Sequence, residues 1–159
     1  RNTTGLVLVA KSSKVQHDLS KSHDRIYREY VALASGVFPE KEGMVDAPIG
    51  RKDGSIIEWT VREDGKPART DYQVMKQLDD FALLRLHLHT GRTHQIRVHM
   101  AYIHHPLLGD DLYGTADARI DRQALHAEMI RFVHPETGKE MEFHAPIPED
   151  MLFWKGDKA

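Results

Sequence analysis

The chain has 159 residues, of which 40% are hydrophobic and 29% are charged, and its formal net charge at pH 7 is -2. This composition predicts one globular domain with its own core, and it argues against a disordered tail and a generic polyanion binder. Because the chain has no cysteine and no apolar run near the ~20 residues that span a bilayer, we expect a cytoplasmic protein without disulfides, thiolate metal sites or membrane contact.

The first half of the chain predicts short strands, one helix and a long region of loops. The apolar run at 6–10 predicts a buried strand, and residues 12–19 predict a short helix capped by a serine. Residues 26–33 alternate and are rich in β-forming side chains, which predicts a strand. Prolines and glycines recur throughout 37–67, so we expect loops there with one strand at 56–61.

The second half predicts two long strands, a helix and a final hairpin before a short terminal helix. The expected elements are strands at 70–77 and 81–89, a helix at 93–103, and a hairpin of strands at 127–133 and 141–145. In the second of these strands, leucines alternate with arginine and histidine, which predicts one buried and one open face. The many hairpins predict an α+β fold with a largely antiparallel mixed sheet and flanking short helices.

One run of the chain is free of acidic residues. Residues 81–109 contain no Asp or Glu, although the chain has 24 of them. The same run carries Arg85, Arg92 and Arg97 and six of the eleven histidines. Such a concentration of donors predicts an anionic ligand held on one face, which the overall charge conceals.

Four sequence blocks stand in an order that is similar to one enzyme family. They are Arg-Asn-Thr-Thr-Gly-Leu at 1–6, Arg-Glu-Tyr-Val-Ala at 28–32, Gly-Arg-Thr-His-Gln-Ile-Arg-Val-His at 91–99, and a His-Pro and Tyr-Gly pattern within 105–135. They resemble the motifs of the RluA-type pseudouridine synthases, which act on large-subunit ribosomal RNA and transfer RNA. The resemblance spans nearly the whole chain.

The resemblance implies a fold, a reaction and a missing group. Residues 1–159 would be the C-terminal portion of a pseudouridine synthase catalytic domain, without its N-terminal part. The family's catalytic aspartate stands immediately before the residue that aligns with Arg1, so we expect this chain alone to be inactive. The implied reaction isomerises uridine to pseudouridine in structured RNA and needs no cofactor. The base must leave its stack to react.

The resemblance also implies roles for individual residues. Tyr30 would stack on the flipped base close to C5, whereas Tyr27 would lie on the opposite face of its strand. Arg97 would pair with the aspartate, although Arg92 remains the alternative partner of that aspartate. Asp110 would bound a loop. The expected RNA contacts are Arg1, Arg92, Thr93, His94 and Gln95.

Two alternatives to this enzyme remain at the level of sequence. The same fold could serve as a non-catalytic RNA-binding module. In either case, large-subunit (23S) ribosomal RNA is the first expected partner, and transfer RNA is the second. The pair His87-x-His89 lies on one strand face and raises the possibility of a metal site. A catalytic metal site usually adds a carboxylate or thiolate, and the run contains neither, so we expect no metal and interpret the histidines as donors to RNA phosphate.

Overall fold

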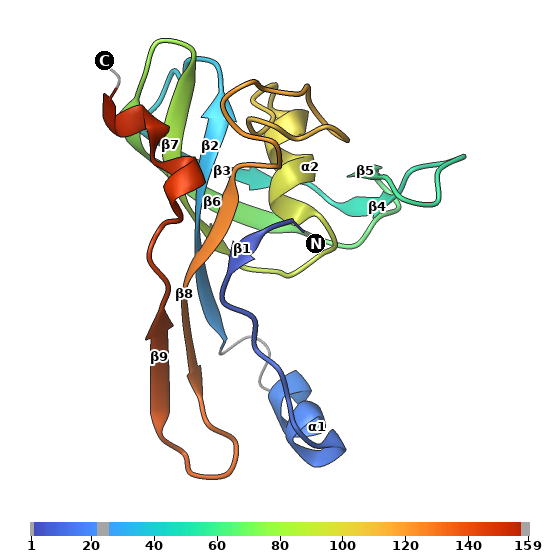
Figure 1. The fold of residues 1–159 in the computed structure, drawn as a ribbon. Helices are drawn as coiled ribbons and strands as arrows, with labels where there is room; N and C mark the ends of the chain where they lie inside the picture. The colour runs from blue at the N-terminus through green and yellow to red at the C-terminus, as the bar shows by residue number, and fades with distance from the viewer. Residues whose placement is uncertain (1, 22–25, 157–159) are drawn as a thin grey trace.

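The computed structural model of the chain describes residues 2–21 and 26–156 (Figure 1). Within them the strands form a seven-stranded sheet in the order β1-β8-β2-β7-β6-β3, with β9 also paired to β8, and a separate two-stranded sheet, β4-β5. The large sheet consists of β1 (Thr4–Gly5), β2 (Tyr27–Ser35), β3 (Glu42–Asp46), β6 (Arg69–Gln77), β7 (Phe81–Leu88), β8 (Leu125–Val133) and β9 (Glu140–His144). The small sheet consists of β4 (Ile49–Arg51) and β5 (Trp59–Val61).

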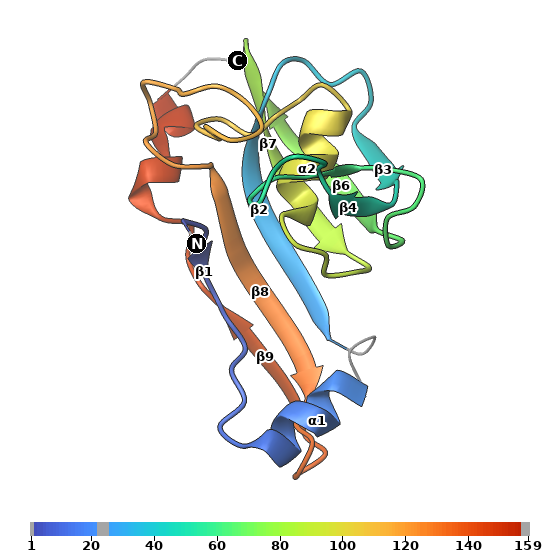
Figure 2. The same cartoon turned by 90° about the vertical axis from the view of Figure 1, so that its right-hand side faces the viewer.

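Short helices flank this sheet. α1 (Ser13–Lys21) lies beside the far end of β2 and the β8–β9 hairpin (Figure 1). α2 (Gln95–Tyr102) lies on one side of the central strands, and the 3-10 helices η2 (Glu149–Met151) and η3 (Phe153–Gly156) lie on the other (Figure 2). Because only the β1–β8 pairing is parallel, the expected α+β fold with a largely antiparallel mixed sheet is confirmed.

The alternation of β7 builds a core on each face of the sheet. Leu84 and Leu86 are fully buried with Ile96 and Met100 of α2, as the sequence predicted for this face. On the other face, Leu83 and its neighbours pack against the C-terminal 3-10 helices. Two separate cores therefore hold the central strands between α2 and the chain's C-terminal segment. No helix in the described residues is long and apolar enough to cross a bilayer.

The predicted strand at 6–10 is wrong. The segment is extended and alternates in burial, but only Thr4–Gly5 forms a strand. The reason lies in the pairing of β8. One edge of β8 pairs with β2. Its other edge pairs with β1 at residues 126–127 and with β9 from residue 129 onward. Since β9 occupies the edge that the segment would need, the chain leaves the sheet after residue 6.

The loop region and the second helix also differ from prediction. Residues 37–67 contain β3, β4 and β5, whereas the expected strand at 56–61 is formed only by Trp59–Val61, and Ile56 is 87% exposed. The sequence did not predict β3 because Gly43 interrupts its strand pattern. Glycine is needed there because any side chain would collide with the phenol of Tyr72 on the paired strand. The second helix begins at residue 95 rather than 93, because residue 94 adopts a left-handed conformation.

Candidate active site

A cleft of about 370 Å³ opens where the N-terminal segment, β2, the end of β7, α2 and the start of β8 meet. Five predicted site residues line it, namely Tyr30, Arg92, His94, Gln95 and Arg97. Thr3 and Thr4 of the N-terminal segment line it too. Thr93 is exposed and is not among the lining residues. Arg1 lies outside the described residues. Side chains from distant parts of the chain thus share one cavity wall; Tyr30 and Arg97 alone are 67 positions apart.

Tyr30 reaches this cleft from a distorted part of β2. The pairing of β2 with β8 shifts register between Glu29 and Tyr30, and a bulge of this kind re-aims the side chain that follows it. Burial raises the pKa of the Tyr30 phenol, and the charge of Arg28 opposes that rise only in part. The phenol is therefore neutral at ordinary pH. Tyr27 stacks on His87 at 4.2 Å between ring centroids, on the opposite face as predicted.

Arg97 is held by a carboxylate of this chain. Its Nε donates to Asp110 Oδ2 at 2.8 Å and its Nη2 to Asp110 Oδ1 at 2.9 Å, a planar two-bond pair. The guanidinium lies over the ring of Tyr113 at 5.1 Å. Burial opposes the charge of Arg97, but the hydrogen bonds and charge of Asp110 outweigh it and raise the Arg97 pKa. Arg97 is therefore a fixed cation in the cleft wall.

Asp110, the partner of Arg97, is also held by several hydrogen bonds. The carboxylate is fully buried, and its Oδ1 also accepts the backbone N–H groups of Leu112 and Tyr113 at 3.1 Å each. Burial raises the pKa of Asp110, yet Arg97 and these two N–H groups together hold it below its usual range. Asp110 therefore bounds a turn, as the sequence predicted, and in addition it anchors Arg97, which the sequence did not show.

Gln95 organises the loop before α2. Its Oε1 accepts from the Thr90 hydroxyl at 2.7 Å and from the Arg92 N–H at 3.0 Å. Its Nε2 donates to the Arg69 carbonyl at 2.9 Å and to the Thr70 hydroxyl at 3.0 Å. All four hydrogen bonds of the amide are thereby made inside the protein. This geometry favours a positioning role for Gln95, and its contact with RNA stays a prediction.

His94 stands at the cleft in a strained conformation. Its φ of 55° is left-handed, a region that residues other than glycine rarely adopt and that is frequent at functional sites. Its Nδ1 and the Tyr113 hydroxyl are hydrogen-bonded at 2.6 Å. Burial and the charge of Arg97 lower the His94 pKa, so the imidazole is neutral at pH 7. Beside it, Arg92 Nε donates to the Pro67 carbonyl at 2.7 Å.

The run without acidic residues does not form one acid-free surface, and the anionic ligand expected on one face stays a prediction. Arg85 lies on the opposite face, 3.7 Å from Glu29 and 3.5 Å from Glu128, which neighbouring strands supply. Within the part of the chain that the structure describes, Arg92 is the one arginine of the run without an acidic partner. None of the described residues that line the cleft is Asp or Glu. The cleft itself is thus cationic.

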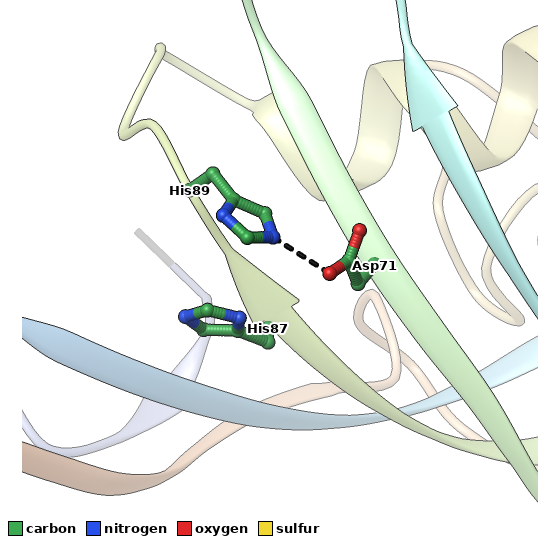
Figure 3. Close-up of side chains that lie close together, drawn as sticks. All are labelled: Asp71, His87 and His89. Atoms are coloured by element: carbon green, nitrogen blue, oxygen red, sulfur yellow. Dashed lines mark hydrogen bonds and ion pairs between the residues drawn. The ribbon is translucent and has the colours of Figure 1, made fainter.

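A second group of side chains could hold a metal ion, on the opposite face of the sheet. Asp71 of β6 and His87 and His89 near the end of β7 point toward one another (Figure 3). Their potential ligand atoms all lie within 4.8 Å of one another. The run at 81–109 itself has no carboxylate, which argued against a metal, but the adjacent strand β6 supplies Asp71.

Comparisons with known proteins bear on the cleft. A family described as RNA pseudouridylate synthase matches residues 1–102. "Uncharacterized RNA pseudouridine synthase YjbO" of Bacillus subtilis is 50% identical over 153 residues, which cover 95% of this chain and 54% of that protein. "Ribosomal large subunit pseudouridine synthase D" of Escherichia coli K12 is 47% identical over an alignment of 168 positions, which covers 96% of this chain and 51% of that protein. The chain spans about half the length of the curated relatives it matches.

Solved structures are similar as well. "Human RNA Pseudouridylate Synthase Domain Containing 1" superposes with a TM-score of 0.73 at 28% identity, covering 87% of this chain and 61% of that one. "Human RNA Pseudouridylate Synthase Domain Containing 4" superposes with a TM-score of 0.67 at 21% identity, covering 88% of this chain and 66% of that one, and supports the fold alone.

Proposed function

The chain belongs to the RNA pseudouridylate synthase family, and from this membership we propose that its cleft takes part in isomerising uridine to pseudouridine in structured RNA. The observation that carries the proposal is the convergence of Tyr30, Arg92, His94 and Arg97 on one cavity. An aromatic ring beside fixed cations suits a nucleotide, whose base stacks and whose phosphate is anionic. Residues 1–159 are then the C-terminal portion of the catalytic domain.

In this reaction, the residues on the different walls of the cleft have different roles. The N-glycosidic bond between N1 and C1′ breaks, the uracil turns within the site, and C5 bonds to C1′ of the ribose. C5 then loses its proton, and N1 takes one up. The reaction is redox-neutral and uses no activated water. Tyr30 stacks on the flipped uracil, and its neutral hydroxyl, which hydrogen-bonds no described residue, stands near C5. Arg92 meets a phosphate, because it is the arginine of the run without an acidic partner.

The carboxylate that attacks or deprotonates the ribose comes from outside residues 1–159. No described lining residue is acidic, and Asp110 is fully buried and bound by Arg97 and two backbone amides. We place the aspartate at the position immediately before Arg1 in a longer polypeptide. Thr4, whose Oγ1 is hydrogen-bonded to His126 Nδ1 at 2.8 Å, fixes the N-terminal segment along the cleft. Arg97 Nη1, which bonds no described residue, is the partner of that aspartate.

Large-subunit ribosomal RNA is the proposed substrate, with transfer RNA second. The proposal follows the names of the relatives from Escherichia coli and Vibrio cholerae, which are 47% and 46% identical to this chain. Such a substrate places the reaction in the cytoplasm. Extruding a base costs a few kcal/mol, so loops and weakly paired uridines are favoured.

The deciding experiment measures tritium release from RNA that carries [5-³H]uridine. A polypeptide that begins upstream of Arg1 should release tritium, and the 159-residue chain should release none. Release by the 159-residue chain would overturn the placement of the aspartate. If neither polypeptide releases tritium but both retain ribosomal RNA in a salt-dependent way, the protein is instead an RNA-binding module of this fold.

Two tyrosines on the same strand give a matched pair of variants in the longer polypeptide. Tyr30→Phe keeps the stacking ring but loses the hydroxyl, so kcat should fall about 100-fold or more while KM changes little. Tyr27→Phe alters a hydroxyl on the opposite face, where Tyr27 donates to Glu29 at 2.7 Å, and should leave both constants unchanged. Equal effects of the two substitutions would contradict the role of Tyr30.

A further inference from the structure

We propose that Asp71, His87 and His89 form a binding site for a divalent transition metal ion of the Zn²⁺ type, on the sheet face opposite the cleft (Figure 3). His87 lies in β7, and His89 directly follows its last residue. Their imidazole rings lie 4.5 Å apart between centroids. Asp71 of β6 is the direct cross-strand partner of His87. The antiparallel pairing of β6 with β7 thus brings two histidines and one carboxylate together at the end of β7.

The donor set is the one that open zinc sites use. Two imidazole nitrogens and one carboxylate oxygen are three protein ligands, which leave a fourth tetrahedral position for water. Ligands about 2.0–2.2 Å from zinc are roughly 3.3–3.5 Å from one another. Here His89 Nε2 and Asp71 Oδ2 are 2.6 Å apart, and all three ligand atoms lie within 4.8 Å. Side-chain rotation can close this set around an ion, because strand pairing holds the backbone of Asp71 and His87, and the His89 N–H donates to the Arg69 carbonyl at 3.1 Å.

Neighbouring side chains orient the proposed ligands and set the charge around them. Tyr27 stacks on His87 at 4.2 Å between ring centroids and limits the orientations of that imidazole. Glu29 faces His87 from β2, so carboxylate-bearing residues flank this histidine on both neighbouring strands. Arg69 is one opposing cation, with its Nε 3.4 Å from Asp71 Oδ1, a long contact that leaves Oδ2 to the histidine side. Two further cations lie near the site, Arg85 at 3.7 Å from Glu29 and Arg131 at 4.6 Å from the centre of the Tyr27 ring. A dication therefore meets a site with carboxylates on two sides.

An ion can reach the site without unfolding the protein. The side chains of Asp71 and His89 are 37% and 36% exposed. In addition, the site is linked to the cleft through Thr90, which follows His89 and whose hydroxyl bonds the Arg69 N–H and Gln95. An ion that ties β6 to β7 would hold this connection and stabilise the loop from the outside, away from the proposed chemistry.

The test titrates the full chain, without an affinity tag and after removal of metal by EDTA, with Zn²⁺ in a calorimeter and with Co²⁺ in a spectrophotometer. We expect one ion per chain, and visible Co²⁺ absorption of the intensity typical of four-coordinate sites. Asp71→Asn, His87→Gln and His89→Gln should each weaken Zn²⁺ binding at least about tenfold. Asp71→Asn is nearly isosteric, and unfolding of each variant in EDTA shows whether its fold is intact.

His144 provides the matched control. Its Nε2 lies 2.8 Å from Glu142 Oε2, the same kind of histidine–carboxylate pair on a strand but without a second histidine. His144→Gln should leave the affinity for Zn²⁺ unchanged. The proposal is overturned if the wild-type chain binds no Zn²⁺, or if the three cluster variants bind it as tightly as the wild type. In the second case the ion lies on other histidines of the chain.

Discussion

Two aspartates on opposite sides of the same sheet show how differently one side chain can be used. Asp110, next to the cleft, is fully buried and accepts four hydrogen bonds, two from Arg97 and two from backbone amides. Asp71, on the other face, is 37% exposed and has one short partner, His89 at 2.6 Å, and one long one, Arg69 at 3.4 Å. The first carboxylate is closed to new partners and the second is open to them.

The surroundings of each carboxylate decide where it can act. Asp110 accepts three hydrogen bonds at Oδ1 and one at Oδ2, and its complete burial keeps other partners away. Asp110 can therefore fix the position of Arg97 but cannot take up a substrate or an ion. Asp71 keeps acceptor capacity toward His87 and solvent, so it can bind something more. This contrast predicts a graded series of effects.

The largest effect should follow Asp110→Asn. The substitution leaves the charge of Arg97 buried without its counter-ion, which costs about 3–5 kcal/mol of unfolding free energy. Urea denaturation of the wild type and the variant measures this loss. Asp111→Asn, at the exposed neighbouring position, is the control and should change stability by less than about 0.5 kcal/mol. Similar losses in the two variants would show that the Arg97 pair contributes little.

The same pair should give a pH dependence of defined sign. The folded-state pKa of Asp110 lies below its unfolded value, so its contribution is complete above the unfolded value, about 3.9, and is lost as pH falls through the folded pKa. The stability gap between wild type and Asp110→Asn should stay constant from about pH 7 to pH 5 and narrow below about pH 4. Other acids are shared by both proteins and cancel. A gap that widens in acid would refute the assignment.

A smaller loss is expected on the cleft side for Gln95→Ala. The substitution leaves partly buried partners of the amide without this hydrogen bond, among them the Arg92 N–H and the Arg69 carbonyl, at a cost of about 2 kcal/mol. Chemical denaturation measures it, and Gln73→Ala on the exposed position of β6 is the matched control. A neutral Gln95→Ala would mean that the amide does not hold the loop.

The smallest effect on intrinsic stability should come from Asp71→Asn. In EDTA the half-exposed pair with His89 contributes less than about 1 kcal/mol. With Zn²⁺ present, the wild type should gain stability and the variant should not, because only the wild type keeps its full ligand set. Thermal melts of both proteins, with and without Zn²⁺, measure the two differences. A Zn²⁺-dependent gain in both proteins would remove Asp71 from the site.

Local patterns predicted those parts of the molecule that depend on a single segment. The alternation in 81–89 and the β-forming run at 26–33 correctly indicated β7 and β2, because burial of one face imposes a period of two. The run at 6–10 failed because β9 takes the strand edge that it needs. The block at 91–99 correctly predicted four residues that line the cleft, but Thr93 is exposed and does not line it.

The order of the motifs identified the family, the hairpin pattern identified the α+β class, and the motifs named five of the residues that line the cleft, because motif order and local periodicity are properties of consecutive residues. The other lining residues, among them Thr3, Leu88 and Gln123, and the partners of the charged side chains follow from the tertiary structure. Arg97 meets Asp110, thirteen positions away, and His89 meets Asp71, eighteen positions away, because strand pairing and turns bring distant charges together. A run free of acids in the chain is not free of acids in space, since neighbouring strands about 5 Å away supply them.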